Sequence, residues 1–252
     1  MTTNLKKRLA AGEVCLGSWI STASPAVVDV LKFLPLDWFV FDMEHSPTGV
    51  ESVGTMIGTL GGSNVAPIVR VGQADQALIK NVLDAGSEGI VIPLVNSKEE
   101  AERAVRLCKY PPLGIRGTAM GRAARYGLDG ARYLRSANDE NMVIVQIETT
   151  TALSNLESIA AVNGVDVLFV GPSDLTMSLG LIDDRTNPRV VDAMLRVVGA
   201  CREHGKAAGV MAATTDEAKK AVERGFGFIS LGSDVRHLIV GAREFLKAAG
   251  RP

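Results

Sequence analysis

Two carboxylates, Glu148 and Asp174, follow two short apolar runs in this 252-residue sequence. Gln146 lies two residues before Glu148, so on an extended strand both side chains point to the same side. Because no pair of Cys or His lies nearby, the carboxylates suit a hard cation such as Mg²⁺ or Mn²⁺, with water and substrate oxygens filling the remaining positions. The sequence therefore predicts a divalent-metal site. The alternative is that Glu148 is an exposed strand-end carboxylate and Asp174 caps a helix.

A histidine and an arginine follow two other apolar runs. His45 comes directly after Asp42 and Glu44, and an imidazole can take up or release a proton near neutral pH. Asp84, on a later helix, is a candidate to orient the imidazole ring of His45. Arg70 ends the next apolar run, where a guanidinium can stabilise a developing oxyanion. A buried salt bridge from Arg70 to Asp42 or Glu44 is the alternative, and the two roles are compatible.

The segment 171–174 (GPSD) has the composition of a turn from a strand into a helix. Gly171 would let a ligand approach the backbone closely. The N–H groups of Ser173 and Asp174 would be free at a helix start, which favours an anion such as a carboxylate. Alone, this short segment is weak evidence for an anion site. The prediction is strengthened because the segment lies beside the candidate metal ligands in the sequence.

These side chains all follow strand-like segments. Short apolar runs alternate with longer amphipathic stretches, as expected for parallel strands buried on both faces and separated by helices. The expected strands are Leu16–Ile20, Trp38–Asp42, Pro67–Val71, Gly89–Pro93, Val143–Ile147, Asp166–Val170, Ala207–Met211 and Phe228–Leu231. Eight such units predict one domain, 1–252, folded as an α/β (β/α)8 TIM barrel, in which strand ends converge on one mouth. A doubly wound sheet competes, but no G-x-G-x-x-G follows the first strand.

The expected helices lie between these strands. They are Pro25–Phe33, Gly49–Leu60, Asp75–Ala85, Ser97–Cys108, Thr151–Val162, Pro188–His204, Thr215–Glu223 and Ser233–Ala249. Between the fourth and fifth strands the alternation is interrupted over Cys108–Glu140. A connection this long is usually functional, so we expect a functional or interaction arm there.

The composition excludes several classes of protein. Hydrophobic residues make up 46% and charged residues 22%, with a formal net charge of −1. This balance argues against a disordered chain and against a nucleic-acid binder that works by bulk charge. The apolar runs are too short to span a membrane, and no secretory signal is seen. Three widely spaced cysteines favour a reducing cytoplasm.

Seven segments together make this chain resemble the HpcH/HpaI aldolase family, the class II pyruvate-dependent aldolases of the phosphoenolpyruvate/pyruvate barrel superfamily. They occur in the family's order across about residues 15–235, and they are specific as a set. The segments are 37–45 (DWFVFDMEH), 70–71 (RV), 83–86 (LDAG), 110–117 (YPPLGIRG), 146–149 (QIET), 164–166 (GVD) and 171–175 (GPSDL).

The resemblance implies roles for the candidate residues. Glu148 and Asp174 would bind the metal (Mg²⁺ or Mn²⁺, with Co²⁺ and Zn²⁺ as further candidates), and pyruvate would chelate it through its carboxylate and keto oxygens. His45, paired with Asp84, would transfer a proton, and Arg70 would stabilise the enolate. The residues implied in substrate binding are Trp19, Gln146, Gly171, Pro172, Ser173, Asp174 and Arg122, with Asp42 and Glu44 in support. No organic cofactor is expected.

The implied reaction is reversible cleavage of 4-hydroxy-2-oxo acids to pyruvate and an aldehyde. The enolate that forms needs either a lysine Schiff base or a metal as electron sink, and none of the ten lysines lies at a strand's carboxyl end. The main alternative is another lyase of the superfamily acting on an acyl-thioester or phosphoenolpyruvate-like substrate. A sugar-phosphate isomerase and a metal-binding protein without turnover are further alternatives.

The resemblance also implies assembly into a hexamer, a dimer of trimers, in which the last helix is exchanged between neighbours. The loop Arg116–Gly127 would reach towards the mouth of an adjacent subunit. The aldehyde is left open among succinic semialdehyde, small hydroxyaldehydes and longer sugar-acid fragments. Arg116, Arg122 and Arg125 would favour an anionic aldehyde, unless they are solvated surface arginines.

Overall fold

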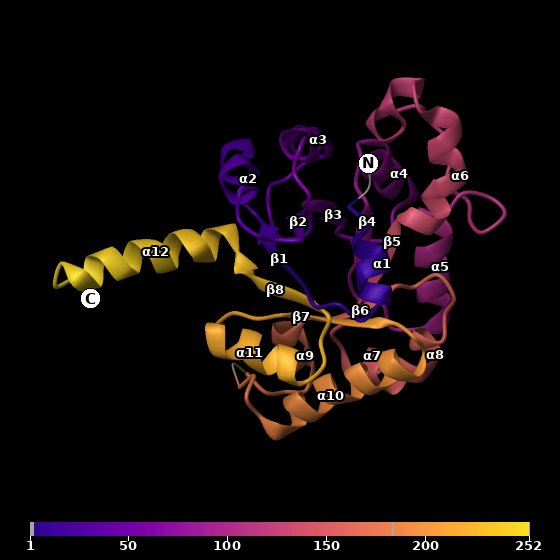
Figure 1. Cartoon of the computed structure of the whole chain (residues 1–252). Coiled ribbons are helices and arrows are strands. Elements are labelled where there is room, and N and C mark those ends of the chain that lie inside the picture. Colours follow the sequence, from indigo (N-terminus) through magenta and orange to yellow (C-terminus); the bar gives the residue numbers. More distant parts are fainter. Residues whose placement is uncertain (1–2, 183, 252) are drawn as a thin grey trace.

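The strands form a closed parallel barrel in which each strand pairs with the next and β8 pairs with β1 (Figure 1). The computed structural model describes residues 3–182 and 184–251. The strands are β1 Cys15–Ile20, β2 Trp38–Asp42, β3 Ala66–Arg70, β4 Gly89–Ile92, β5 Met142–Ile147, β6 Val167–Val170, β7 Ala207–Met211 and β8 Phe228–Ser233. The predicted (β/α)8 TIM barrel is confirmed, and the doubly wound alternative is wrong.

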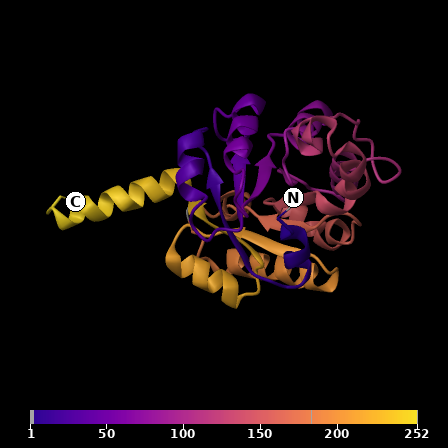
Figure 2. The same cartoon turned by 45° about the horizontal axis from the view of Figure 1, so that its top comes forward.

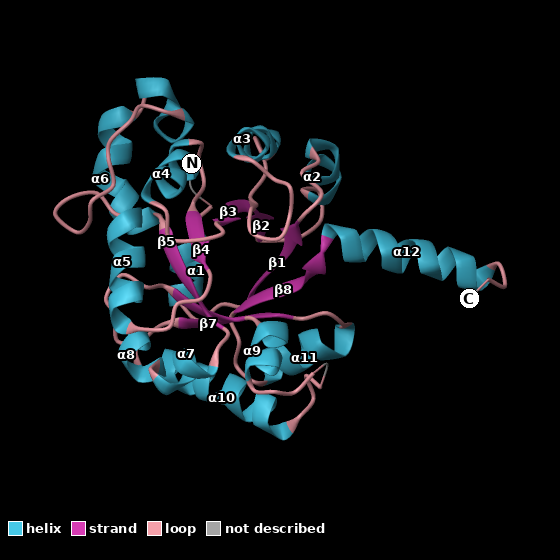
Figure 3. Ribbon diagram, turned by 180° about the vertical axis from the view of Figure 1, so that it is seen from behind, coloured by secondary structure: helices cyan, strands magenta, loops and turns pink. Residues whose placement is uncertain are grey.

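Helices surround the barrel on the outside (Figure 3). They are α1 Leu5–Ala10, α2 Pro25–Leu31, α3 Val50–Thr59, α4 Gln76–Asp84, α5 Lys98–Cys108, the 3₁₀ helix η1 Arg122–Gly127, α6 Gly130–Glu140, α7 Thr150–Ser154, α8 Leu156–Ala160, α9 Pro172–Ser178, α10 Pro188–Glu203, α11 Thr215–Glu223 and α12 Asp234–Ala248. Serine side chains cap two of these helices: the Ser24 hydroxyl accepts from the Val27 N–H, and the Ser97 hydroxyl accepts from the Glu100 N–H.

Aromatic side chains fill the inside of the barrel. The Trp38 indole stacks on the Phe228 ring with centroids 3.9 Å apart, and Trp19 packs edge-on against Phe169. Gly17 lies opposite Trp38 in the strand register, where a Cβ would come within 2.1 Å of the indole. A larger residue at position 17 would therefore displace the stacked pair from the barrel centre.

The connection between β4 and β5 differs from the prediction. The functional or interaction arm expected over Cys108–Glu140 contains, after the end of α5, two helices that were not predicted: η1 and the 11-residue helix α6. The buried side chain of Arg116 holds this segment together, since its guanidinium packs over the rings of Tyr110 and Tyr133 at 4.5 and 5.6 Å. One predicted helix, Thr151–Val162, is instead broken into α7 and α8 at Asn155, whose side-chain amide donates to a carbonyl outside the helix.

Helix α12 points away from its own barrel (Figures 1 and 2). Only its start is anchored: the buried Asp234 carboxylate accepts hydrogen bonds from the Ser21 and Thr22 backbone N–H groups. Beyond this anchor the apolar side chains of Leu238 and Phe245 are 60% and 81% exposed. In the described part of the chain, no helix combines the length and apolar character needed to cross a membrane.

Candidate metal and substrate site

The barrel brings the polar strand ends together at its carboxyl-terminal mouth. Asp42 and Arg70 are partners in the register of β2 and β3. Glu148 directly follows β5, and Asp174 lies in the first turn of α9, just after β6. Charge interactions link Glu44 and Glu148 with Arg70 and Asp174, so the candidates form one cluster.

Arg70 lies at the centre of this cluster and is held by two carboxylates. Its Nε and Nη2 donate to the two oxygens of Asp42 at 2.9 and 2.8 Å, and its Nη1 lies 2.8 Å from a Glu44 oxygen. Its guanidinium also packs over the Trp19 ring at 4.3 Å. Burial alone would raise the pKa of Asp42, but the hydrogen bonds and charge of Arg70 outweigh it and lower that pKa. The salt bridges considered from the sequence are therefore formed.

Glu148 and Asp174 lie close together, with Gly171 beside them. A Cβ at Gly171 would stand 2.7 Å from Glu148 Oε2 and 3.5 Å from Asp174 Oδ2. The Leu94 N–H donates to Glu148 Oε1 at 2.7 Å, and the Gln146 amide donates to Oε2 at 2.9 Å. Burial raises the pKa of Glu148, and the nearby charges of Asp174 and Glu44 raise it further. The pair therefore has a strong electrostatic reason to hold a cation.

These donors fit a hard divalent cation. Both are carboxylates at a site that only glycine leaves open, and they repel one another without a positive charge between them. Among residues 3–182 and 184–251, no group of three or more His, Cys, Asp or Glu side chains is arranged to hold a metal. The chain would thus supply two ligands and leave the remaining positions to water and substrate oxygens, as Mg²⁺ sites commonly do.

Leu94 is a residue of this site that the sequence did not predict. Its φ of 53° lies in the left-handed region, which leucine rarely adopts, and this conformation directs its N–H to Glu148. The surrounding structure imposes this backbone strain. The residue type leucine does not indicate it, so the sequence alone could not have predicted it.

His45 lies at the rim of the mouth with 67% of its side chain exposed. Its Nε2 is 3.8 Å from Glu44 Oε2, and its backbone N–H, like that of Glu44, donates to Asp42 Oδ1. Asp42 therefore shapes the turn that presents His45, and the imidazole stays accessible to a ligand.

The expected pairing of Asp84 with His45 is not formed within this chain. Asp84 is the last residue of α4 and pairs with Arg116 at 2.7 Å. Helices of a β/α barrel run antiparallel to the strands, so α4 ends near the amino-terminal ends of the strands, whereas His45 follows a carboxyl end. The two residues thus belong to opposite ends of the same barrel.

Of the remaining predicted substrate residues, four lie at the mouth and Arg122 lies away from it. Trp19 and Gln146 are buried at the mouth, and neither Trp19 Nε1 nor Gln146 Oε1 has a hydrogen-bond partner among the described residues. Pro172 and Ser173 form the first turn of α9 as predicted. Arg122 instead packs beside Gly58 and Gly86, at the ends of α3 and α4, and so lies away from its own mouth.

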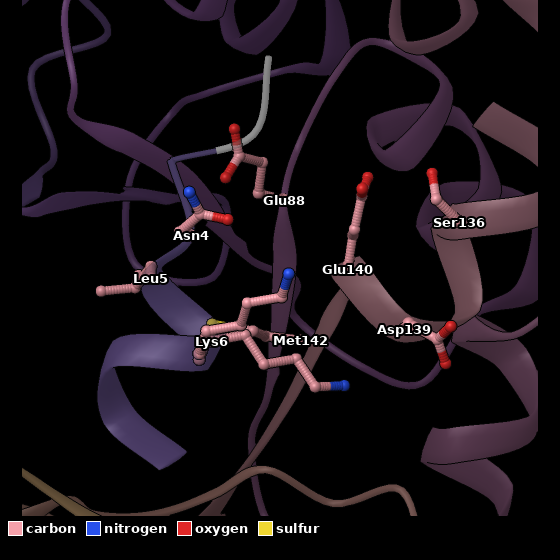
Figure 4. Close-up of a pocket in the computed structure, with 9 residues that line it drawn as sticks. Asn4, Leu5, Lys6, Glu88, Ser136, Asp139, Glu140 and Met142 are labelled. Atoms are coloured by element: carbon pink, nitrogen blue, oxygen red, sulfur yellow. The ribbon is translucent and has the colours of Figure 1, made fainter. Parts of the chain in front are cut away.

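A separate cavity of about 290 Å³ lies at the opposite end of the barrel (Figure 4). Figure 4 shows Lys6, Glu88, Ser136, Asp139 and Glu140 around it. The lining mixes cations with carboxylates and includes none of the residues at the mouth. This cavity is therefore not part of the candidate site.

Comparisons with known proteins agree with this fold. The family model described as HpcH/HpaI aldolase/citrate lyase matches residues 16–240. A hydroxypyruvate/pyruvate aldolase from Roseovarius nubinhibens is 37% identical over 97% of this chain and 96% of its own length. A 4-hydroxy-2-oxovalerate aldolase from Rhodococcus jostii is 38% identical, covering 97% of this chain and 95% of the relative. The crystal structure of a HpcH/Hpal aldolase/citrate lyase family protein from Burkholderia cenocepacia superposes with a TM-score of 0.95 at 37% identity, covering 98% and 99% of the two chains.

Proposed function

The chain belongs to the HpcH/HpaI aldolase/citrate lyase family, and on that premise we propose that it is a divalent-metal-dependent class II aldolase. It cleaves 4-hydroxy-2-oxo acids reversibly to pyruvate and an aldehyde. The observation that supports this most is the placement of the Glu148 and Asp174 carboxylates beside Gly171, with the fixed guanidinium of Arg70 in the same cluster.

Breaking the bond between C3 and C4 leaves an enolate, whose negative charge must be stabilised. A cation held by Glu148 and Asp174 would supply Lewis-acid stabilisation of that charge. Arg70 contributes a second positive charge, and its three short contacts to Asp42 and Glu44 hold it in place before the reaction begins. Such preorganised charge costs little reorganisation when the enolate forms.

His45 is the candidate for moving the proton of the 4-hydroxyl group. It is the accessible imidazole at the rim, on the turn that Asp42 fixes. In the cleavage direction it would accept the hydroxyl proton as the aldehyde carbonyl forms, and in the synthetic direction it would return it. General bases of this kind contribute on the order of 10²–10⁴ in rate.

A Schiff-base lysine is the competing electron sink, and Lys109 is the lysine to consider because burial lowers its pKa to about 8. Its ammonium group, however, donates to the backbone carbonyls of Asn138 and Asn141. These carbonyls lie at the end of α6 just before β5, on the amino-terminal side of the barrel. The lysine is therefore occupied and remote from the mouth.

We also infer that the working enzyme is an oligomer. The exposed apolar face of α12, including Leu238 and Phe245, has no counterpart on its own barrel. A face of this kind is normally covered by another subunit. Arg122 and the segment around it, which lie away from their own mouth, are available to contact a neighbour. A hexamer with an exchanged last helix accounts for both features.

The decisive experiment is a retro-aldol screen of 4-hydroxy-2-oxo acids with pyruvate detection, run with Mg²⁺, Mn²⁺, Co²⁺ and Zn²⁺ after chelation. Glu148→Gln and Asp174→Asn should each lose both Mn²⁺ binding, measured by calorimetry, and pyruvate release. Asp192→Asn, at an exposed position of α10, is the matched control and should retain both. Full activity after exhaustive chelation, or a lysine trapped by borohydride with pyruvate, would refute the metal mechanism.

A further inference from the structure

A second cavity, of about 180 Å³, lies in the outer helical layer between α10 and α11, beside the start of α9. These three helices lie together on one side of the barrel (Figures 1 and 3). Its floor is apolar, because Pro172, Met194, Val210 and Ala221 line it and are buried. A hydrocarbon group could therefore lie against this floor without contacting charge.

The rim of this cavity is cationic. Arg185, Lys220 and Arg224 line it, opposed by the single acid Glu217 among its lining residues. The Glu217 carboxylate already accepts a hydrogen bond from the Ala213 N–H at the start of α11. Within residues 3–182 and 184–251, none of the three cations forms an ion pair within 4.0 Å. The rim therefore carries an excess of positive charge that suits an anion.

Arg185 connects this cavity to the mouth. Its Nη2 donates to the Ser173 hydroxyl, in the turn whose N–H groups are expected from the sequence to bind a carboxylate, which in the proposed function is that of pyruvate. Pro172, the residue before it, lines the cavity. An anion in the cavity would compete with Ser173 for the Arg185 guanidinium, and it would remove positive charge from the pyruvate turn.

We propose that this cavity binds a compact organic carboxylate and that its occupancy weakens the binding of pyruvate at the mouth. The carboxylate pairs with Arg185, Lys220 and Arg224, and its hydrocarbon part covers the apolar floor. The cavity lies below the roughly 300–1,000 Å³ of sites for larger ligands, so the ligand is small. The coupling rests on the proposed function, whereas the binding does not.

The binding is tested by calorimetric titration of the Mn²⁺-loaded protein with hexanoate, with hexanol and inorganic phosphate as comparison ligands. Hexanoate should bind most tightly, because only it offers both charge and hydrocarbon. Lys220→Gln should weaken hexanoate binding about three- to tenfold by removing one charged contact. Lys219→Gln, its exposed neighbour outside the cavity, should bind hexanoate as the natural protein does. Equal affinities for the two variants, or tighter binding of phosphate than of hexanoate, would overturn the proposal.

The coupling is tested by measuring the Kd of pyruvate with and without saturating hexanoate. We expect that Kd to rise about fivefold or more, as linked sites usually show, and the rise to disappear in Arg185→Gln. Hexanoate that binds in a Lys220-dependent manner yet leaves the Kd of pyruvate unchanged would overturn the coupling. Failure of pyruvate to bind even without hexanoate would instead contradict the proposed function.

Discussion

Replacing Gly171 with alanine should disturb the metal site without destabilising the fold. The backbone of Gly171, with φ −90° and ψ 93°, is open to any residue, so alanine adds no backbone strain. Its Cβ, however, would stand 2.7 Å from Glu148 Oε2. Because carbon and oxygen normally approach to about 3.3 Å, the carboxylate oxygen must move about 0.6 Å.

A movement of this size matters for a metal ligand. Ligand distances in metal sites are kept within about 0.2 Å of their ordinary values, so the displaced oxygen of Glu148 would no longer suit the cation. We expect the Kd for Mn²⁺ to rise about 10- to 100-fold, as when supporting groups around a metal are lost. Pyruvate release should fall at limiting metal and recover in excess metal, because both carboxylates are still present.

The assay is calorimetric titration with Mn²⁺ after chelation, together with pyruvate release measured over a range of metal concentrations. Gly49→Ala is the matched control, since Gly49 has an ordinary φ of −95° and no atom lies within 4 Å of its added Cβ. The control should bind Mn²⁺ as the natural protein does. If Gly171→Ala also binds Mn²⁺ normally, Glu148 Oε2 does not face the cation and our placement of the site is wrong.

Three further outcomes are expected. Arg70→Lys should lower the rate of pyruvate release about 10²-fold, as loss of one oxyanion donor does, while calorimetry shows nearly unchanged Mn²⁺ binding. The pKa of Lys109 is lowered from 10.5 to about 8 in the folded state, so the folded protein binds fewer protons than the unfolded chain between these values. Lys109 should therefore add about 3 kcal/mol to the free energy of unfolding as pH rises through that window, seen in urea unfolding as the difference between the natural protein and Lys109→Met, because the buried thiols of Cys108 and Cys201, whose pKa values are raised, act with the opposite sign in both proteins. Arg116→Met should lower the free energy of unfolding, measured in urea, by about 3 kcal/mol because it leaves the Asp84 carboxylate unpaired. Arg132→Gln, which removes an exposed ion pair, should leave the unfolding midpoint nearly unchanged and serves as its control.

The barrel and most of its mouth could be predicted because both follow from the order of the strands. Eight apolar runs separated by amphipathic stretches leave few ways to bury both faces of each strand. In a closed parallel barrel, residues that follow different strands must then meet at one end, which is why Glu148, Asp174 and Arg70 are close together.

The features that the sequence does not predict depend on the directions of helices and side chains and on what these pack against. The pairing of Asp84 with His45 was expected from the family resemblance, whereas within this chain the position of Asp84 at the end of a helix puts it at the other end of the barrel. Arg185 lies in a loop, where no periodic pattern indicates which way a side chain turns. The apolar face of α12 reads the same in sequence whether it packs on its own barrel or on another molecule, so its exchange between subunits was expected from the family resemblance alone.

In the proposed oligomer, helix α12 would make part of the protein's stability depend on protein concentration. Its 15 residues form a helix about 22 Å long that points away from the barrel, so a second molecule would be needed to remove the apolar surface beyond the anchored start from water. Mass action would then govern how much of that surface is covered. On dilution the melting temperature should fall continuously, although no residue of the barrel has changed.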